Sequence, residues 1–170
     1  MSHFTPVIAV HAICALTVLV LGPVQILRPR RDRAHRLLGR TWAVAMVLTC
    51  GSSFLITPHG FTWLHGLAIF ALVSLTLGVL AIRRRNVRMH RNNLIGSYLG
   101  TAIAFAFAVL VPQRAIPQLL RTEPVVALGT ALAVGAAVAA YSLAVVRSTS
   151  SSTARGSAPR PRAAAARPRA

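Results

Sequence analysis

The feature that most constrains the fold is a series of long apolar runs separated by blocks of arginine. Five runs can be distinguished, over residues 6–27, 41–57, 61–82, 94–111 and 125–146. An α-helix rises about 1.5 Å per residue, so each run covers most or all of the roughly 30 Å hydrocarbon core of a bilayer. With 55% hydrophobic residues, this 170-residue chain is predicted to be an all-α polytopic membrane protein with five transmembrane helices.

Short connections between the runs predict that neighbouring helices are antiparallel. The first four helices are expected to form an up-down four-helix core, and the last is an additional helix. These helices are expected at about residues 6–27, 38–57, 61–82, 92–111 and 125–146 of a transmembrane domain spanning 1–147. Residues 148–170 are rich in Ser, Pro, Ala and Arg and lack an apolar period, which predicts a disordered basic tail.

The distribution of arginine predicts the orientation. All 19 basic residues are arginines: six lie within 28–40, five within 83–91 and six after residue 146, whereas the loop at 112–124 has two. By the positive-inside rule the N-terminus is outside and the C-terminus is cytoplasmic, in the inner (cell) membrane of a bacterium. Topology therefore explains the formal charge of +17 without a nucleic acid, and the cytoplasmic arginines are expected to attract anionic lipids. Trp63 and Trp42 are expected near opposite membrane interfaces.

A histidine-centred motif, R-x-R-x-x-R-x-H-R, occurs twice, once around His35 and once around His90. Each copy follows another histidine inside an apolar run by 24 or 25 residues: His11 precedes His35, and His65 precedes His90. The repeat indicates that the four-helix core is a duplicated transmembrane hairpin with one histidine near each membrane face.

The residue inventory excludes several kinds of chemistry. No Asp or Glu lies within an apolar run, which excludes carboxylate proton relays, di-iron carboxylate sites and Ser-His-Asp triads inside the membrane. There is no phosphate-binding glycine loop or dinucleotide fingerprint. Cys14 and Cys50 are isolated and are interpreted as small buried hydrophobes. No stand-alone enzyme is expected.

The four repeated histidines are the candidate cofactor ligands. In an up-down bundle the first and third helices are diagonal, as are the second and fourth. This predicts an outer pair, His11 with His65, and an inner pair, His35 with His90. Paired imidazoles suit the axial positions of haem b, a carrier of single electrons. The candidates for binding haem propionates are Arg36, Arg40 and Arg91.

Two other functions compete with transmembrane electron transfer to a redox partner or quinone. The histidines can instead be interfacial side chains of a cofactor-free scaffold or assembly protein. A small-solute transporter is less favoured, because the chain has no pair of broken helices and no carboxylate in the membrane. The sequence leaves the oligomeric state open.

Several motifs resemble a known family. They are His11 in the first helix, the Gly-Pro-Val-Gln segment at 22–25, the His-Arg-Leu-Leu-Gly-Arg segment at 35–40, and His90-Arg91. Over residues 6–111 these motifs resemble an uncharacterised bacterial membrane family, domain of unknown function 2306. That family follows its last histidine with Arg and then an aromatic residue and Met, whereas in this chain His90-Arg91 is followed by Asn-Asn-Leu. The resemblance implies fold and membrane location but no activity.

A more distant resemblance is to cytochrome b561-like membrane proteins, which hold two haems in a four-helix core. It implies an outer haem on His11 and His65 and an inner haem on His35 and His90.

Overall fold

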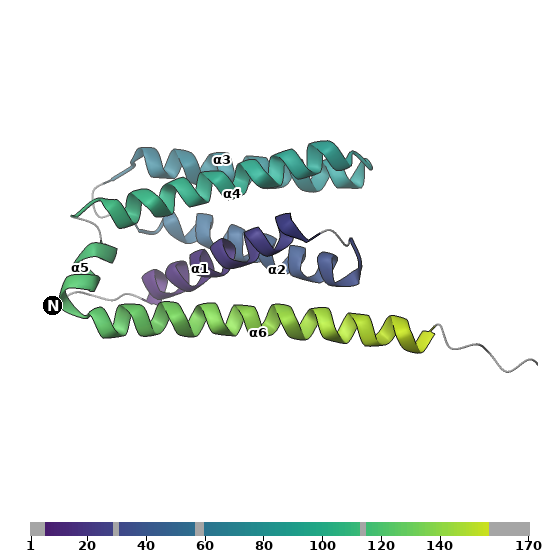
Figure 1. Ribbon diagram of the computed structural model, residues 1–170. Coiled ribbons are helices and arrows are strands. Elements are labelled where there is room, and N and C mark those ends of the chain that lie inside the picture. Colours follow the sequence, from purple (N-terminus) through teal and green to yellow (C-terminus); the bar gives the residue numbers. More distant parts are fainter. Residues whose placement is uncertain (1–5, 29–30, 57–59, 113–114, 157–170) are drawn as a thin grey trace, which may run out of the picture.

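The computed structural model describes residues 6–28, 31–56, 60–112 and 115–156. These residues form six α-helices and no strand (Figure 1), which confirms the all-α prediction. The helices are α1 (Pro6–Leu27), α2 (Arg33–Ser53), α3 (Trp63–Arg83), α4 (Val87–Leu110), α5 (Ala115–Thr122) and α6 (Pro124–Gly156).

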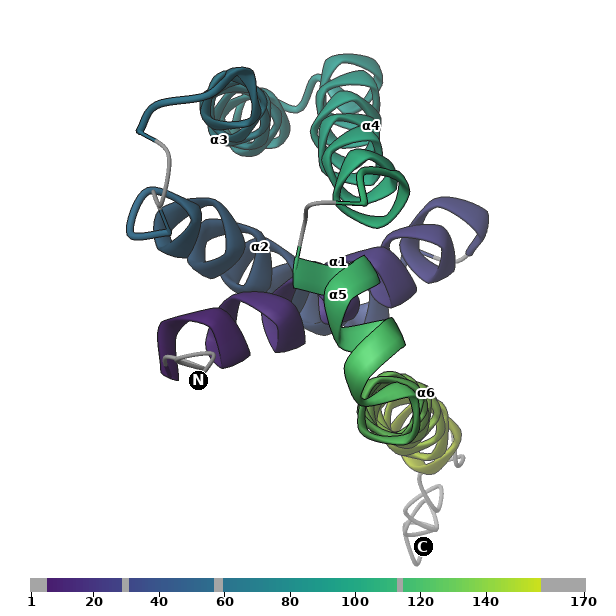
Figure 2. The same ribbon diagram turned by 90° about the vertical axis from the view of Figure 1, so that its left-hand side faces the viewer.

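The first four helices pack in a ring. α1 contacts α2 and α4, and α3 also contacts α2 and α4, so that α1 lies diagonally from α3 and α2 from α4 (Figure 2). This is the arrangement predicted for an up-down four-helix core. The long helix α6 packs along α1 and α2, on the side away from α3 and α4.

Helix α5 was not predicted, because the loop at 112–124 contains Pro112 and Pro117. Its apolar residues follow a helical spacing: Ile116 and Leu119 are half-buried, whereas Gln118 is exposed. The helix contacts both α4 and α6, so it covers the end of the bundle between them. This amphipathic spacing was the signal that could have identified it.

Two helices begin earlier than their apolar runs. α2 begins at Arg33 rather than near residue 38, because Asp32 caps it: the Asp32 Oδ1 accepts a hydrogen bond from the backbone N–H of His35 at 3.0 Å. α4 begins at Val87 rather than near residue 92, because Asn86 Oδ1 accepts one from Met89 N–H at 3.0 Å. His35 and His90 therefore lie in the first turns of α2 and α4.

Four of the described helices, α1, α3, α4 and α6, are long and apolar enough to cross a membrane. α2 does not meet this criterion, because Arg33, Arg36 and Arg40 occupy its first two turns. Its 21 residues still extend about 31 Å, the thickness of the hydrocarbon core.

Helix α6 ends later than predicted. It continues to Gly156, so the beginning of the expected disordered tail is helical, because Ser and Ala can extend a helix whose preceding turns are already formed. Residues 157–170 of the predicted tail lie outside the described residues.

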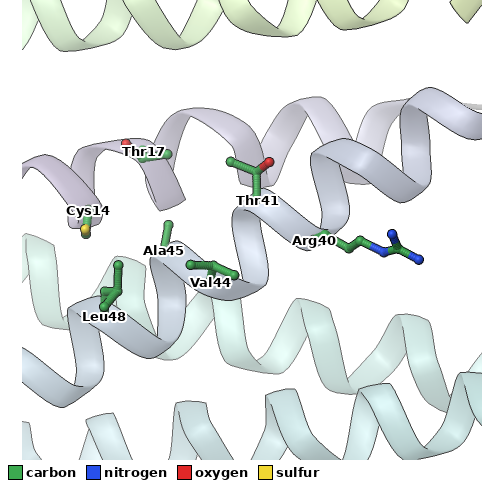
Figure 3. A pocket seen from close by; sticks show the side chains of 7 residues that line it. All are labelled: Cys14, Thr17, Arg40, Thr41, Val44, Ala45 and Leu48. Atoms are coloured by element: carbon green, nitrogen blue, oxygen red, sulfur yellow. The ribbon is translucent and has the colours of Figure 1, made fainter.

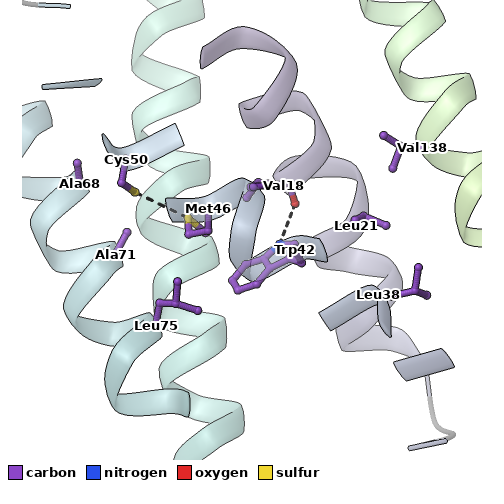
Figure 4. Packing of buried hydrophobic residues seen from close by; sticks show 11 residues of the cluster. Val18, Leu21, Leu38, Trp42, Met46, Cys50, Ala68, Ala71, Leu75 and Val138 are labelled. Carbon is purple, nitrogen blue, oxygen red and sulfur yellow. Dashed lines mark hydrogen bonds between the residues drawn. The ribbon is translucent and has the colours of Figure 1, made fainter. Parts of the chain in front are cut away.

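The core joins α1, α2 and α3 and extends to Val138 of α6 (Figure 4). Trp42 lies inside it at 4% exposure and donates its indole N–H to Val18 O at 3.1 Å. Trp42 is therefore a core side chain that bonds to α1. Trp63 is 52% exposed. Large apolar side chains on the outer faces, such as Leu132 and Val125, are also exposed, as lipid-facing side chains are.

Candidate functional site

The outer histidine His11 fastens α1 to the end of α2. Its Nδ1 lies 3.1 Å from Thr49 O and 3.0 Å from Ser52 Oγ. A carbonyl can only accept, and the Ser52 hydroxyl donates its own hydrogen to Leu48 O at 2.6 Å. Nδ1 of His11 is therefore the donor in both contacts, and the lone pair of the neutral ring is on Nε2.

The outer histidine His65 has the opposite tautomer. The backbone N–H of Thr62 donates to His65 Nδ1 at 3.0 Å, so the neutral ring carries its proton on Nε2. This bond belongs to a capping box that closes the first turn of α3. The ring is 5% exposed and stacks on Phe61 with a centroid separation of 4.8 Å. Its surroundings are those of a buried structural histidine.

The two outer histidines differ in whether Nδ1 donates or accepts a hydrogen bond, and therefore in whether Nε2 is free to bind a metal. A histidine that binds a metal through Nε2 usually donates its Nδ1–H to a carbonyl or carboxylate. His11 has this arrangement and His65 does not. The described part of the chain contains no group of three or more His, Cys, Asp or Glu that could hold a metal ion, and this holds for the outer and the inner pair alike. The hydrogen bonds therefore do not prepare the outer pair as two equivalent axial ligands.

The inner histidine His90 has the arrangement typical of a ligand. Its Nδ1 donates to the backbone carbonyl of Gly78 on α3 at 2.8 Å, which leaves the Nε2 lone pair free. Gly78 is buried, and a Cβ there would clash with Leu94. The absence of a side chain at position 78 thus lets α4 approach α3 closely enough for this bond.

The inner histidine His35 lies in the first turn of α2. It precedes the apolar part of α2, and it is half-buried. Its Nδ1 is buried and has no hydrogen-bond partner among the described residues. The two members of the inner pair thus belong to α2 and α4, which are diagonal in the ring of four helices.

A network of polar side chains surrounds His35, which we call the inner polar cluster: Gln25, Arg28, Asp32 and His35. Gln25 Nε2 donates to His35 O at 3.0 Å, and Arg28 Nη2 donates to Asp32 Oδ2 at 2.7 Å. The hydrogen bond from His35 N–H and the charge of Arg28 hold the pKa of Asp32 below its usual value. These bonds join the end of α1 to the start of α2.

Three buried atoms of the inner polar cluster lack a partner within the described residues: Gln25 Oε1, Arg28 Nη1 and His35 Nδ1. Buried polar atoms are nearly always hydrogen-bonded, and leaving one unpaired costs about 1–3 kcal/mol. An acceptor, a cationic donor and an imidazole nitrogen thus gather where a polar or anionic ligand would satisfy them. This makes the cluster the strongest candidate site in the described part of the chain.

The arginines predicted to bind propionates are placed differently from Arg28. Arg36, Arg40 and Arg91 are exposed, whereas the Arg28 side chain is only 12% exposed. No role was predicted for Arg28 or Gln25, although Arg28 begins the first histidine-centred motif and Gln25 ends the Gly-Pro-Val-Gln segment. A signal for Arg28 was present in the sequence: Asp32, one of the two acidic residues of the chain, follows it by four residues and could pair with it.

No curated protein and no solved structure matches this chain. A family model described as Predicted membrane protein (DUF2306) matches residues 8–144. The match includes the inner polar cluster and all four candidate histidines, and it extends beyond residues 6–111 through α5 and into α6. The chain therefore belongs to this family of membrane proteins.

Proposed function

We propose that this membrane protein binds one b-type haem between His35 on α2 and His90 on α4, and that it transfers electrons within the membrane. The observation that carries the proposal is that two atoms of the inner polar cluster, the Nδ1 of His35 and the Nη1 of Arg28, are both buried and unpartnered among the described residues. The outer pair is not part of this proposed site.

The residues of the inner pair fit a haem in their donor chemistry. The bond from His90 Nδ1 to Gly78 O orients the ring and makes Nε2 more basic, as carbonyl partners of ligating histidines do. The Nδ1 of His35 has no hydrogen-bond partner among the described residues, so this nitrogen is not committed elsewhere. Both rings belong to first turns fixed by Asx caps.

Arg28 supplies the anion-binding group in this proposal. One nitrogen of its guanidinium is held by Asp32 at 2.7 Å, which leaves Nη1 to donate to a propionate by a charge-assisted hydrogen bond. Arg28 thereby takes the role first expected of Arg36, Arg40 and Arg91. Its positive charge favours the reduced state of a neighbouring redox centre.

When bound, the six-coordinate haem would accept and release single electrons. The protein residues position it and set its electrostatic surroundings. His11 and His65 have structural roles: His11 ties α1 to α2, and His65 caps α3. The partner in electron transfer is a membrane redox protein or a quinone.

The arginine distribution supports the topology and orientation that we propose for the protein in the membrane. The transmembrane domain spans residues 1–147 and crosses a bacterial inner membrane five times, with the N-terminus outside and residues 148–170 on the cytoplasmic side. The inner polar cluster then lies at the cytoplasmic face, where anionic lipids attract the surrounding arginines.

The test is an absorption spectrum of the full-length protein, purified in detergent from haem-replete cells, before and after dithionite. The wild type is expected to show a Soret band and a sharpened reduced spectrum. His35→Ala and His90→Ala are expected to lose most of the haem, whereas His11→Ala and His65→Ala retain it. Arg28→Gln is expected to bind haem with a lower midpoint potential.

A folded wild-type protein without a Soret band would refute the proposal and would favour the cofactor-free scaffold. Loss of haem from the outer variants but not from the inner ones would also refute it. Gel filtration of each variant separates loss of haem from loss of fold.

A further inference from the structure

A groove of about 470 Å³ lies between α1 and α2, a volume within the range of ligand-binding pockets. It runs from Cys14 and Leu48 at one end to Arg40 at the other (Figure 3). Leu48 and Arg40 are eight residues apart on α2, so the groove extends about 12 Å along the helix axis. Its direction therefore follows the helices, from the apolar part of α2 towards its arginine-rich end.

The walls of the groove are apolar in character. Leu48, Val44 and Ala45 line it from α2. Its two threonine hydroxyls are already satisfied: Thr17 Oγ1 donates to Ile13 O at 2.8 Å, and Thr41 Oγ1 bonds to Leu37 O and to Tyr141 OH. A ligand seated between these walls would therefore be held by apolar contact.

Arg40 gives one end of the groove a positive charge. The chain has two acidic residues, Asp32 and Glu123; Asp32 pairs with Arg28, and Glu123 lies between α5 and α6. Arg40 therefore has no acidic partner. A guanidinium is well suited to the planar, two-point recognition of a phosphate.

We propose that this groove binds one anionic phospholipid, with an acyl chain against Val44 and Leu48 and the phosphate on Arg40. Charge complementarity at one end and an apolar wall along the rest match the two parts of such a lipid. This site is separate from the inner polar cluster and does not depend on haem. The proposed site also differs from the general attraction of arginines to an anionic surface, because only Arg40 of the six arginines in residues 28–40 lines the groove.

The experiment titrates the detergent-purified full-length protein with phosphatidylglycerol and counts bound lipid by native mass spectrometry. Arg40→Gln is expected to weaken binding about fivefold, since one basic residue contributes about 1 kcal/mol to anionic-lipid attraction. Arg40→Lys keeps the charge and should recover part of this loss. The matched control is Arg33→Gln, an exposed arginine two turns earlier on α2 and outside the groove.

A second pair of variants tests the acyl chain. Val44→Trp fills the groove and should reduce binding, whereas Val47→Trp, at an exposed position of the same helix outside the groove, should not. Phosphatidylcholine should bind less than phosphatidylglycerol, and glycerol phosphate without acyl chains should not compete.

If Arg33→Gln and Arg40→Gln weaken phosphatidylglycerol binding equally, the proposal is overturned in favour of a diffuse attraction of the lipid to the charged surface. Unchanged binding in Val44→Trp, or competition by glycerol phosphate, would overturn it as well. The haem spectrum of Arg40→Gln is expected to be that of the wild type, so a failure of this proposal can be distinguished from a failure of the haem site.

Discussion

The aromatic ring of Tyr98 on α4 packs directly against the backbone of Gly22 on α1. The approach is so close that a β-carbon at position 22 would overlap Cδ2 and Cε2 of the ring. Gly22 is buried, and this contact links α1 to α4, which closes the ring of four helices. The Gly-Pro pair in this motif thus serves helix packing, and α1 continues through Pro23 to Leu27.

Gly22→Ala is therefore expected to destabilise the protein by about 1–3 kcal/mol, the usual cost of overpacking. Unfolding in a mixed detergent titration, followed by circular dichroism, measures this change. Gly66→Ala on α3 is the matched control, because a β-carbon there meets nothing within 4 Å. Combining Gly22→Ala with Tyr98→Ala should cost less than the sum of the two single changes, and simple additivity would contradict the packing argument.

Ser97 joins α4 to α3 in a completely buried position. Its hydroxyl donates to Ala71 O at 2.9 Å. Ser97→Ala is expected to cost about 0.6 kcal/mol, the average for a hydrogen bond between membrane helices. Thr76→Ala removes an exposed hydroxyl that bonds within its own helix, to Leu72 O, and should cost less in the same assay. The reverse order would show that Ser97 does not hold the two helices together.

Asp32 both caps α2 and pairs with Arg28. Asp32→Ala removes both interactions, whereas Asp32→Asn keeps a side-chain acceptor for the cap and loses the charge. We expect thermal stability to fall in the order wild type, Asn, Ala, and protease cleavage near Arg31 to rise in the same order. Equal stability of the Asn and Ala variants would mean that the cap contributes nothing and that the ion pair accounts for the whole effect.

The five-crossing topology can be tested with single cysteines placed before α2, at position 31, and between α2 and α3, at position 61. In a background with Cys14 and Cys50 replaced by Ala, Phe61→Cys should react with a membrane-impermeant maleimide from outside the cell. Arg31→Cys should react only after permeabilisation, because the proposed orientation places its arginine block on the cytoplasmic side. If both cysteines react from the same side, α2 does not cross the bilayer.

Local chemistry accounts for the parts of the fold that the sequence predicted. Apolar runs of bilayer length and arginine blocks indicated the long helices and the diagonal order of the first four, since short loops leave few alternatives. The early starts of α2 and α4 are local too: the caps at Asp32 and Asn86 lie three residues before the N–H groups that they bind. A search for caps, rather than hydropathy alone, would have found them.

The candidate site was predictable only in part. Repetition of the motif singled out His35 and His90, which the structure places in the first turns of α2 and α4. Spacing could not distinguish the tautomers of His65 and His90, because the tautomer depends on the hydrogen-bond partner of each ring. His65 accepts from Thr62 N–H, whereas His90 donates to Gly78 O. Nor could spacing show that Arg28 is buried while Arg36 is exposed.

The sequence by itself therefore determined an all-helical membrane protein with its histidines in two sets, because the bilayer restricts both the length of a helix and the places where charge is tolerated. Tertiary structure alone decided which imidazole nitrogen is free, which arginine is buried, and that α6 docks on α1 and α2. These properties depend on neighbours that are distant along the chain, since packing places a carbonyl or a carboxylate beside a side chain.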